Sequence, residues 1–262
     1  MNNLKIDLAV VLPTLNEADN LRYLIPEIIQ VIRKNNVNNF QVLVLDDQST
    51  DNTIETITKL NEKYENVNLI TRKNSPSLPL SIWEGIDNAE YEYVMWLDAD
   101  GSMTAKGIDS MLKELNQNKN SVIIGSRFVK GGGFKGLEVE NPSLVSAIQK
   151  VYKSEDSVLA VMLSRIFNFV IYFILNTGIK DVTSGFIVGR KEYFYKEQFE
   201  IASYGDYFIY LIKDLKKKNV EMKEVGYICE TRRFGLSKSG TSLLILLKRS
   251  FPYFKAAFKV NK

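Results

Sequence analysis

The stretch Tyr-Val-Met-Trp-Leu-Asp-Ala-Asp at residues 93–100 joins a run of apolar side chains to two closely spaced carboxylates. An uncharged run of this length, rich in aromatic and branched side chains, is typical of a strand covered on both faces. Asp98 and Asp100 follow that strand directly, and Ser102 comes two residues later. Oxygen ligands in this pattern bind hard divalent cations, although an acidic turn in solvent has the same pattern. We predict a metal site formed by Asp98, Asp100 and Ser102.

Strand and helix signals alternate through the first half of the chain, on both sides of this stretch. Further strands are expected at residues 8–12, 40–45, 67–71 and 121–124, with helices at residues 21–32, 53–64, 79–89 and 104–116. Apolar strands that alternate with helices indicate a mostly parallel sheet with helices on both faces. We therefore predict a fold of the α/β class.

Polar residues follow each of the five predicted strands. In open parallel sheets, ligands bind beyond the carboxyl ends of the strands. Asp46 and Asp47 follow the second strand and offer hydrogen-bond acceptors for a base or ribose, or a cap for the next helix. The other strand ends carry the turn 13–17 with Glu17, then Arg72, the pair Asp98 and Asp100, and Arg127. We expect these residues to meet at one edge of the sheet.

The composition restricts the chemistry of such a site. The 262 residues contain no histidine and one cysteine, Cys229. A histidine base, a Ser-His-Asp triad and a conventional zinc site are therefore excluded, and oxygen ligands favour Mg²⁺ or Mn²⁺. Lys and Arg number 34 against 31 Asp and Glu, so the net charge of +3 gives no support to a nucleic-acid partner.

The second half contains two apolar segments with a basic loop before the second. The segment 158–179 is interrupted by Arg165 and Asn168, which indicates a buried or membrane-surface helix rather than a spanning one. Arg165 alternatively lies along an apolar surface with its charge in water. A turn and strand at 181–188, a helix at 207–218, a strand at 220–231, a basic loop at 232–240 and a helix at 243–258 complete the expected elements.

Four motifs occur in order along the chain: Val-Leu-Pro-Thr-Leu-Asn-Glu at 11–17, Leu-Asp-Asp-Gln-Ser-Thr-Asp at 45–51, Trp-Leu-Asp-Ala-Asp at 96–100 and Gly-Ser-Arg-Phe at 125–128. Through them the chain resembles family-two glycosyltransferases of GT-A fold, over roughly residues 7–240. Within that family it resembles dolichol-phosphate mannose synthases and related polyprenyl-phosphate glycosyltransferases. The resemblance implies a Rossmann-like, mostly parallel sheet flanked by helices, with amphipathic acceptor-side and C-terminal helices.

The resemblance also implies roles for individual residues. The nucleotide-sugar donor would contact Pro13, Leu15, Glu17, Asp46, Asp47, Arg72 and Asp98. The acceptor phosphate would contact Arg127, Ser164, Arg165, Arg232 and Lys238. The catalytic residues would be Asp98, Asp100, Arg127 and Arg232, with the metal on Asp98, Asp100 and Ser102. Relatives usually carry a basic residue one turn before Ser164, where this chain has Ala160 and Val161, so the sugar and acceptor stay open.

These features predict a metal-dependent enzyme that moves a sugar, with inversion, from GDP-mannose or a UDP-sugar to a polyprenyl or dolichyl phosphate. A phosphate nucleophile is already ionised near neutral pH, so it needs no histidine base. One alternative is a transferase for a soluble sugar or polysaccharide acceptor with Asp206 as its base, although Asp206 also suits a helix cap. Another is a non-catalytic subunit that binds nucleotides or lipid phosphates.

The expected organisation is a GT-A domain at 1–240 and a C-terminal amphipathic, basic helix at 241–262. Lys248, Arg249, Lys255 and Lys259 would lie near anionic headgroups if that helix rests on a membrane surface. The N-terminus carries no pattern of a cleavable signal peptide. We therefore expect a cytoplasmic protein that is peripheral at the cytoplasmic face of the membrane, in an oligomeric state that the sequence leaves open.

Overall fold

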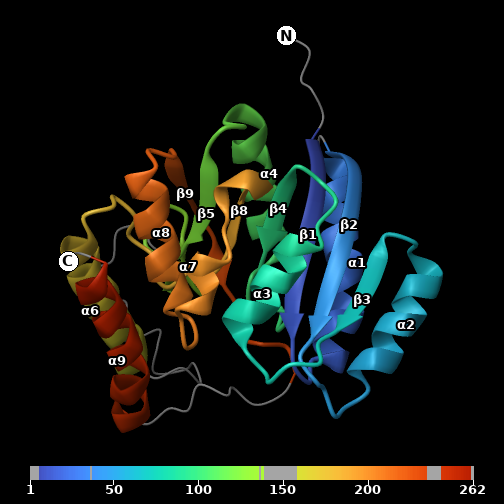
Figure 1. The fold of residues 1–262 in the computed structure, drawn as a ribbon, viewed down its shortest axis with the longest axis horizontal. Helices are drawn as coiled ribbons and strands as arrows, with labels where there is room; N and C mark the ends of the chain where they lie inside the picture. Colours follow the sequence, from blue (N-terminus) through green and yellow to red (C-terminus); the bar gives the residue numbers. More distant parts are fainter. Residues whose placement is uncertain (1–5, 36, 136, 139–157, 235–242, 261–262) are drawn as a thin grey trace.

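A seven-stranded sheet forms the centre of the molecule in the computed structural model, which describes residues 6–35, 37–135, 137–138, 158–234 and 243–260 (Figure 1). Its strand order is β3 (Val67–Thr71), β2 (Val37–Asp46), β1 (Ile6–Thr14), β4 (Tyr93–Trp96), β8 (Ile187–Arg190), β5 (Val122–Ser126) and β9 (Met222–Gly226). Every neighbouring pair is parallel except the two pairs that involve β8. The predicted α/β fold with a mostly parallel sheet is therefore confirmed.

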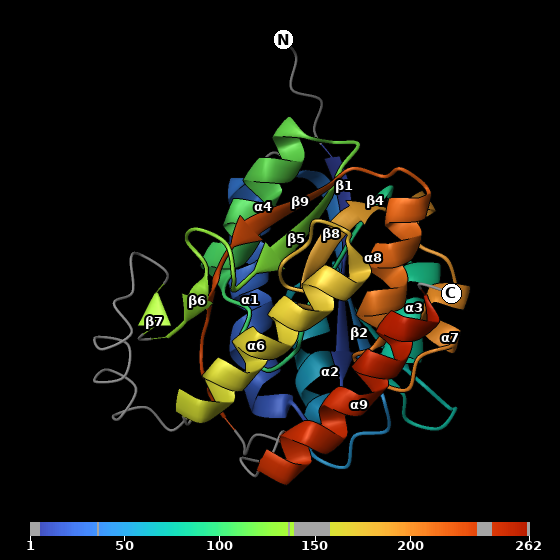
Figure 2. The same cartoon turned by 90° about the vertical axis from the view of Figure 1, so that its left-hand side faces the viewer.

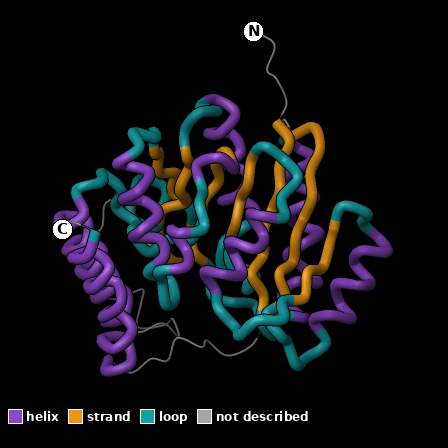
Figure 3. The backbone as a smooth tube through the Cα atoms, in the orientation of Figure 1, coloured by secondary structure: helices purple, strands orange, loops and turns teal. Residues whose placement is uncertain are grey.

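Helices cover both faces of this sheet, as the ribbon and the backbone tube show (Figures 1 and 3). The first core contains side chains of α1 (Ala18–Lys34), α2 (Thr53–Lys63) and α4 (Ala105–Gln117). The second contains side chains of α3 (Leu78–Asp87), α6 (Val158–Leu175), α7 (Glu197–Glu200), α8 (Tyr207–Lys217) and α9 (Leu243–Lys259). Leu8, Val10 and Leu12 of β1 belong to the first core, whereas Ala9 and Val11 belong to the second. This two-sided burial explains why the strand is apolar throughout.

Three short strands form a separate small sheet, in the order β10 (Ile228–Cys229), β6 (Gly133–Phe134) and β7 (Leu137–Glu138). A single 3-10 turn, η1 (Lys191–Tyr193), follows β8. The expected strand at 220–231 is thus divided between β9 in the main sheet and β10 in the small one.

The parallel strands all end at one edge of the sheet, the lower edge in Figure 1. Helix α3 starts near this edge and packs directly on β1 and β2, with Gly85 at the contact. A Cβ atom on Gly85 would lie 2.3 Å from Cγ1 of Val11 and 2.8 Å from Cδ2 of Leu45, so only glycine permits this approach. Close packing there holds α3 against β1 and β2.

Helices α6 and α9 lie side by side at one end of the second helical layer (Figure 2). Phe167 packs edge-on against Tyr253 and Phe254, with ring centroids 5.7 Å and 5.1 Å apart. Apolar side chains on the outer side of the pair are exposed: Ile166, Phe169, Val170, Phe173, Phe251 and Phe258. Within the described ranges, no helix has the length and apolar character needed to cross a membrane.

Candidate functional site

A cavity of about 370 Å³ lies at the carboxyl edge of the sheet. Its wall brings together seven of the predicted site residues: Pro13, Leu15, Glu17, Asp47, Asp98, Asp100 and Arg232. The start of α3 adds Ser77, Leu78 and Ser81, and the turn before α8 adds Ser203 and Tyr204. Segments more than 200 residues apart in sequence, at Glu17 and Arg232, therefore meet at one site.

Asp98 lies two residues beyond the end of β4, and its exposed side chain lines the cavity. Desolvation by the surrounding protein is the larger cause of a raised pKa at the Asp98 carboxyl, and the negative charge of Asp100 is the next. Together they raise this pKa to about 7. Among the described residues, none donates a hydrogen bond to this carboxylate, while its backbone N–H points at Sδ of Met103, 3.3 Å away. The ionised form of Asp98 is thus poorly compensated by the protein alone.

Asp100 is held from two sides, unlike Asp98. The backbone N–H of Ser102 donates to Oδ1 of Asp100 at 2.9 Å, and Nη2 of Arg232 lies 3.2 Å from Oδ2. The same Arg232 nitrogen donates to Oε1 of Glu17 at 3.0 Å. Arg232 therefore rests on two carboxylates at the cavity wall, where an anionic ligand would compete for it.

The residues present fit a divalent cation of the Mg²⁺ or Mn²⁺ type. No group of three or more Asp, Glu, His or Cys side chains that could hold a metal occurs in the part of the chain that the structure describes. Such a group is not required, because Mg²⁺ usually binds one or two carboxylates and takes its other ligands from substrate phosphates and water. A cation would also relieve the repulsion between Asp98 and Asp100 that raises the pKa of Asp98.

The two aspartates after β2 have different positions. Asp47 reaches the cavity wall, and its Oδ2 accepts the backbone N–H of Ser77 at 2.6 Å. Asp46 is fully buried and accepts the backbone N–H of Ser49 at 3.3–3.4 Å. Arg72 lies behind Asp47, to which it is ion-paired, and donates to Glu84 at 2.9 Å. Neither Asp46 nor Arg72 is part of the cavity wall, so their contact with a nucleotide stays a prediction.

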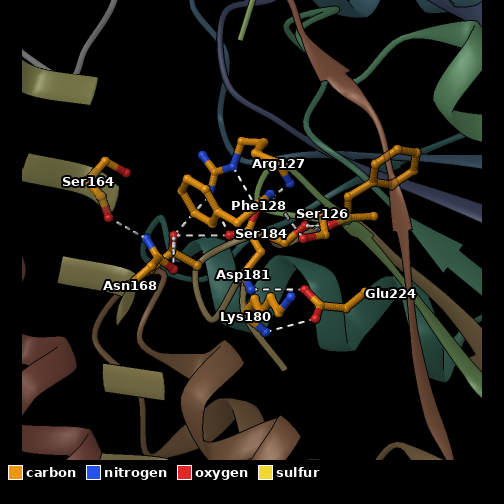
Figure 4. Close-up of polar contacts among 12 residues, drawn as sticks. Ser126, Arg127, Phe128, Ser164, Asn168, Lys180, Asp181, Ser184 and Glu224 are labelled. Carbon is orange, nitrogen blue, oxygen red and sulfur yellow. Dashed lines mark hydrogen bonds and ion pairs between the residues drawn. The ribbon is translucent and has the colours of Figure 1, made fainter. Parts of the chain in front are cut away.

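Arg127, at the end of β5, forms a paired hydrogen bond with a carboxylate that the sequence did not connect to it (Figure 4). Its Nε and Nη2 donate to the two oxygens of Asp181 at 2.8 Å and 2.7 Å, and Nη2 also donates to Thr183 at 2.9 Å. Asp181 is completely buried. Burial by itself would lower the pKa of Arg127, but the Asp181 carboxylate outweighs it, so this pKa is raised and Arg127 stays charged.

The Arg127–Asp181 pair is tied to neighbouring elements (Figure 4). Glu224 of β9 accepts the backbone N–H groups of Lys180 and Asp181 at 2.8 Å and 3.0 Å. On the other side, the Thr183 hydroxyl donates to Asn168 of α6 at 3.3 Å. The turn after α6 is thus fixed between the sheet and α6.

A second cavity of about 310 Å³ opens beside α6. Its wall consists of three aromatic rings and three polar side chains: Phe128, Phe169, Tyr172, Arg165, Asn168 and Lys180. Nε of Arg165 is buried and has no hydrogen-bond partner among the described residues. A cation-bearing, ring-lined cavity of this kind suits an anion attached to an apolar group. Ser164 lies next to this wall on α6, and Lys238 falls outside the described residues.

Comparison with known proteins identifies the family. The family described as glycosyl transferase family 2 matches residues 9–197, and the chain belongs to this family. A dolichol-phosphate mannosyltransferase from Pyrococcus furiosus is 30% identical over 255 residues, covering 97% of this chain and 63% of the relative. A dolichyl-phosphate beta-glucosyltransferase from Homo sapiens is 25% identical over 196 residues, covering 71% of this chain and 55% of the relative. The chain thus spans less than two thirds of the length of these curated relatives.

Solved structures share the fold. Glucosyl-3-phosphoglycerate synthase from Mycobacterium tuberculosis, in complex with UDP, has a TM-score of 0.62 at 15% identity, covering 97% of this chain and 80% of that one. Mannosyl-3-phosphoglycerate synthase from Rubrobacter xylanophilus has a TM-score of 0.60 at 15% identity, covering 97% of this chain and 73% of that one. The expected GT-A fold is therefore confirmed.

Proposed function

We propose that this protein transfers a sugar from a nucleotide-sugar to the phosphate of a polyprenyl lipid, with inversion at the sugar and with a divalent metal. The observation that carries the proposal is the meeting of Asp98, Asp100 and Arg232 in one cavity at the carboxyl edge of the sheet. The Pyrococcus furiosus relative, named dolichol-phosphate mannosyltransferase, supports the same class of acceptor.

The acid-lined cavity is the proposed donor site. Asp98 and Asp100 would hold the metal, which neutralises the departing diphosphate when bound. Arg232 already lies over Asp100 and would turn its planar guanidinium from carboxylate to phosphate oxygens, which it matches equally well. Pro13, Leu15 and Asp47 would enclose the nucleotide from the β1 and β2 side. Solved neighbours of the same fold were crystallised with UDP and Mn²⁺, which supports this kind of donor complex.

The ring-lined cavity beside α6 is the proposed site for the acceptor phosphate. Arg165 and Lys180 bring two positive charges to its wall, and the buried Nε of Arg165 has no hydrogen-bond partner among the described residues. Phe128 borders this cavity and also lies under the guanidinium of Arg127, which places the cavity next to that side of the sheet edge. An ionised phosphate needs orientation rather than deprotonation, so cations are the groups it requires.

The exposed apolar side of α6 and α9 is the proposed membrane contact. Phe169 belongs both to the wall of the acceptor cavity and to this exposed side. A lipid whose phosphate enters the cavity would therefore have its chain beside Phe169 and Phe173. This arrangement favours a protein that lies on a membrane surface.

A soluble acceptor with Asp206 as general base is the main alternative. The Asp206 carboxylate accepts the backbone N–H groups of Ser203 and Tyr204 at 3.1 Å and 2.7 Å, so it is already used to hold the turn before α8. Asp206 is also buried and lies outside the cavity wall, whereas Ser203 and Tyr204 are part of it. The geometry thus favours the ionised phosphate acceptor, which requires no base.

A competition between acceptors tests the choice. The protein is incubated with GDP-mannose or UDP-glucose, Mn²⁺, and a mixture of polyprenyl phosphate in liposomes, 3-phosphoglycerate and free mannose. Mass spectrometry then identifies the glycosylated product. We expect the sugar on the lipid phosphate, and we expect Asp206→Asn to retain this activity if the variant folds. Transfer to 3-phosphoglycerate or mannose alone, with loss in Asp206→Asn, would establish the alternative instead.

A further inference from the structure

Helix α1 carries three side chains that hold the segment containing Arg232. Asn20, Tyr23 and Glu27 are spaced three and four residues apart, so they lie along one face of the helix. Each contacts Arg233 or Phe234, the two residues that follow Arg232. We call these three residues the α1 dock.

Asn20 makes the innermost contacts of the dock. Its Nδ2 donates to the backbone carbonyl of Phe234, and its Oδ1 accepts the backbone N–H of Phe234, both at 3.2 Å. The same Nδ2 donates to Oε2 of Glu17 at 2.7 Å. Asn20 is 4% exposed, so these hydrogen bonds are shielded from water.

Glu17 links the dock to the donor cavity. Its Oε2 is bound by Asn20, and its Oε1 accepts Nη2 of Arg232 at 3.0 Å. The contacts therefore form a closed ring from Asn20 through Glu17 and Arg232 along the backbone to Phe234, and back to Asn20. In this ring Asn20 fixes both the backbone that carries Arg232 and the carboxylate on which its guanidinium rests.

The two outer contacts of the dock are weaker. Tyr23 stacks on Phe234 with ring centroids 5.5 Å apart and an interplanar angle of 18°. Arg233 forms a two-point ion pair with Glu27 at 2.7 Å and 3.2 Å, and both of these side chains are partly in solvent. Exposed ion pairs contribute little and are screened by salt, so Asn20 is the principal residue of the dock.

We propose that Asn20 is a positioning residue for Arg232. It holds the guanidinium at the donor cavity before a ligand arrives, so that little side-chain and loop freedom is lost when a diphosphate binds. The inference rests on the proposed function, because it takes Arg232 to be the group that binds the diphosphate. Asn20 itself is not part of the cavity wall, and acts only through Glu17 and the backbone.

A double-mutant cycle tests this role in the full chain. The dissociation constants of GDP and UDP, each with Mn²⁺, are measured by calorimetry for the wild type, Asn20→Ala, Arg232→Ala and the double variant. Loss of the buried hydrogen bonds is expected to weaken binding on the order of tenfold when Arg232 is present. In the Arg232→Ala background the same substitution should change binding by less than about twofold, because nothing remains to be positioned.

The matched control is Asn39→Ala. Asn39 is an exposed asparagine near the start of β2 whose side chain also bonds to a carboxylate, that of Asp7, at 3.0 Å. The Asn39→Ala variant should bind both nucleotides as the wild type does. If Asn20→Ala does not fold, as judged by thermal denaturation, Asn20→Asp takes its place in the cycle, since it keeps the shape of the side chain but loses the donations from Nδ2 to Glu17 and Phe234.

The outcomes separate the two proposals. Equal weakening by Asn20→Ala in both backgrounds, or no weakening in either, overturns the positioning role alone while Arg232→Ala still weakens binding. Wild-type binding by Arg232→Ala, or no binding of GDP or UDP by the wild-type protein, contradicts the proposed donor site and the positioning role with it.

Discussion

At the scale of single residues, the two aspartates after β4 differ in what surrounds them. Asp100 accepts hydrogen bonds from Arg232 and from the backbone of Ser102, whereas Asp98 faces the cavity with its pKa raised. A cation would compensate Asp98 in the way that Arg232 already compensates Asp100. Asp98 is therefore the residue whose replacement should affect metal binding most specifically.

The substitution Asp98→Asn should weaken Mn²⁺-dependent binding of GDP or UDP by roughly 100-fold or more, since changes at residues that merely support metal ligands already cost 10- to 100-fold. Calorimetry with and without Mn²⁺ measures this loss. Asp87→Asn is the matched control, because Asp87 is exposed at the far end of α3. This variant should bind GDP and UDP with wild-type affinity. Unchanged affinity in Asp98→Asn would exclude this residue as a ligand.

Metal binding should also depend on pH. The pKa of Asp98 is about 7 in the metal-free fold, so protons compete with the cation below that pH and metal affinity should fall as pH falls through 7. An unfolded aspartate titrates near 4, so ionising Asp98 destabilises the metal-free fold as pH rises from about 4 to about 7. Because the stabilisation by Mn²⁺ follows its affinity, the rise in melting temperature caused by Mn²⁺ should be larger at pH 8 than at pH 5.5.

Thermal denaturation across this range measures the effect, with Asp98→Asn as the reference. The variant has no titrating group at this position, so its small response to Mn²⁺ should vary little with pH. A wild-type response that is the same at pH 5.5 and pH 8 would show that Asp98 does not control metal binding.

The sequence predicted most of the donor site residues, but not which of them face the cavity and which lie behind its wall. Glu17, Asp47, Asp98 and Asp100 follow strands, and parallel strands bring their ends together. Which of Asp46 and Asp47 faces the cavity depends on the turn that follows β2, and two adjacent aspartates look alike in sequence. The pairing of Arg127 with Asp181 spans 54 residues and depends on how the turn after α6 meets β5.

At the scale of elements, the first half of the chain follows its sequence pattern closely, and the second half less so. Each of the five predicted strands of the first half is present. Four of them are buried on both faces, whereas β3 lies at the edge of the sheet with only Val67 buried. Strand β8 was expected only as a strand after a turn, and its antiparallel insertion between β4 and β5 was not predicted. The four residues of β8 do not indicate whether the strand runs parallel or antiparallel to its neighbours, because the helices before and after it set its direction.

The pairing of α6 with α9 gives the exposed aromatic side a testable role. Phe169 and Phe173 are 63% and 62% exposed and contact each other with centroids 4.7 Å apart. Full burial of a phenylalanine contributes about 1.5–3 kcal/mol, so Phe169→Ser with Phe173→Ser should weaken membrane binding at least about tenfold. Flotation with anionic liposomes measures this loss, and thermal stability should be unchanged because both rings are exposed.

Ile54→Ser is the control for that experiment, because Ile54 is 43% exposed on α2, which packs on the opposite face of the sheet. It should float with liposomes as the wild type does. Equal flotation of the double phenylalanine variant and the wild type would show that the membrane contact lies elsewhere on the protein. No flotation of the wild type would contradict the proposed membrane contact itself.

At the scale of the whole molecule, one edge of the sheet connects the proposed donor and acceptor sites. The donor cavity lies beyond β1, β2 and β4, and the second cavity lies between the end of β5 and α6. The charge of Arg127 lowers the pKa of Asp98 against the larger effects that raise it, which places the two groups within electrostatic reach. A sugar bound at the first site and a phosphate bound at the second would thus meet near Arg127.

The most direct measurement is the formation of a sugar-linked lipid. GDP-mannose and UDP-glucose are each supplied with polyprenyl phosphate in liposomes, with Mn²⁺ or with EDTA, and the organic-extractable product is quantified for the wild type and Asp98→Asn. Product should form from a nucleotide-sugar only with the metal, and the rate should fall roughly 100-fold or more in Asp98→Asn. Product that forms equally in EDTA, or equally in Asp98→Asn, would contradict metal-dependent transfer at this site.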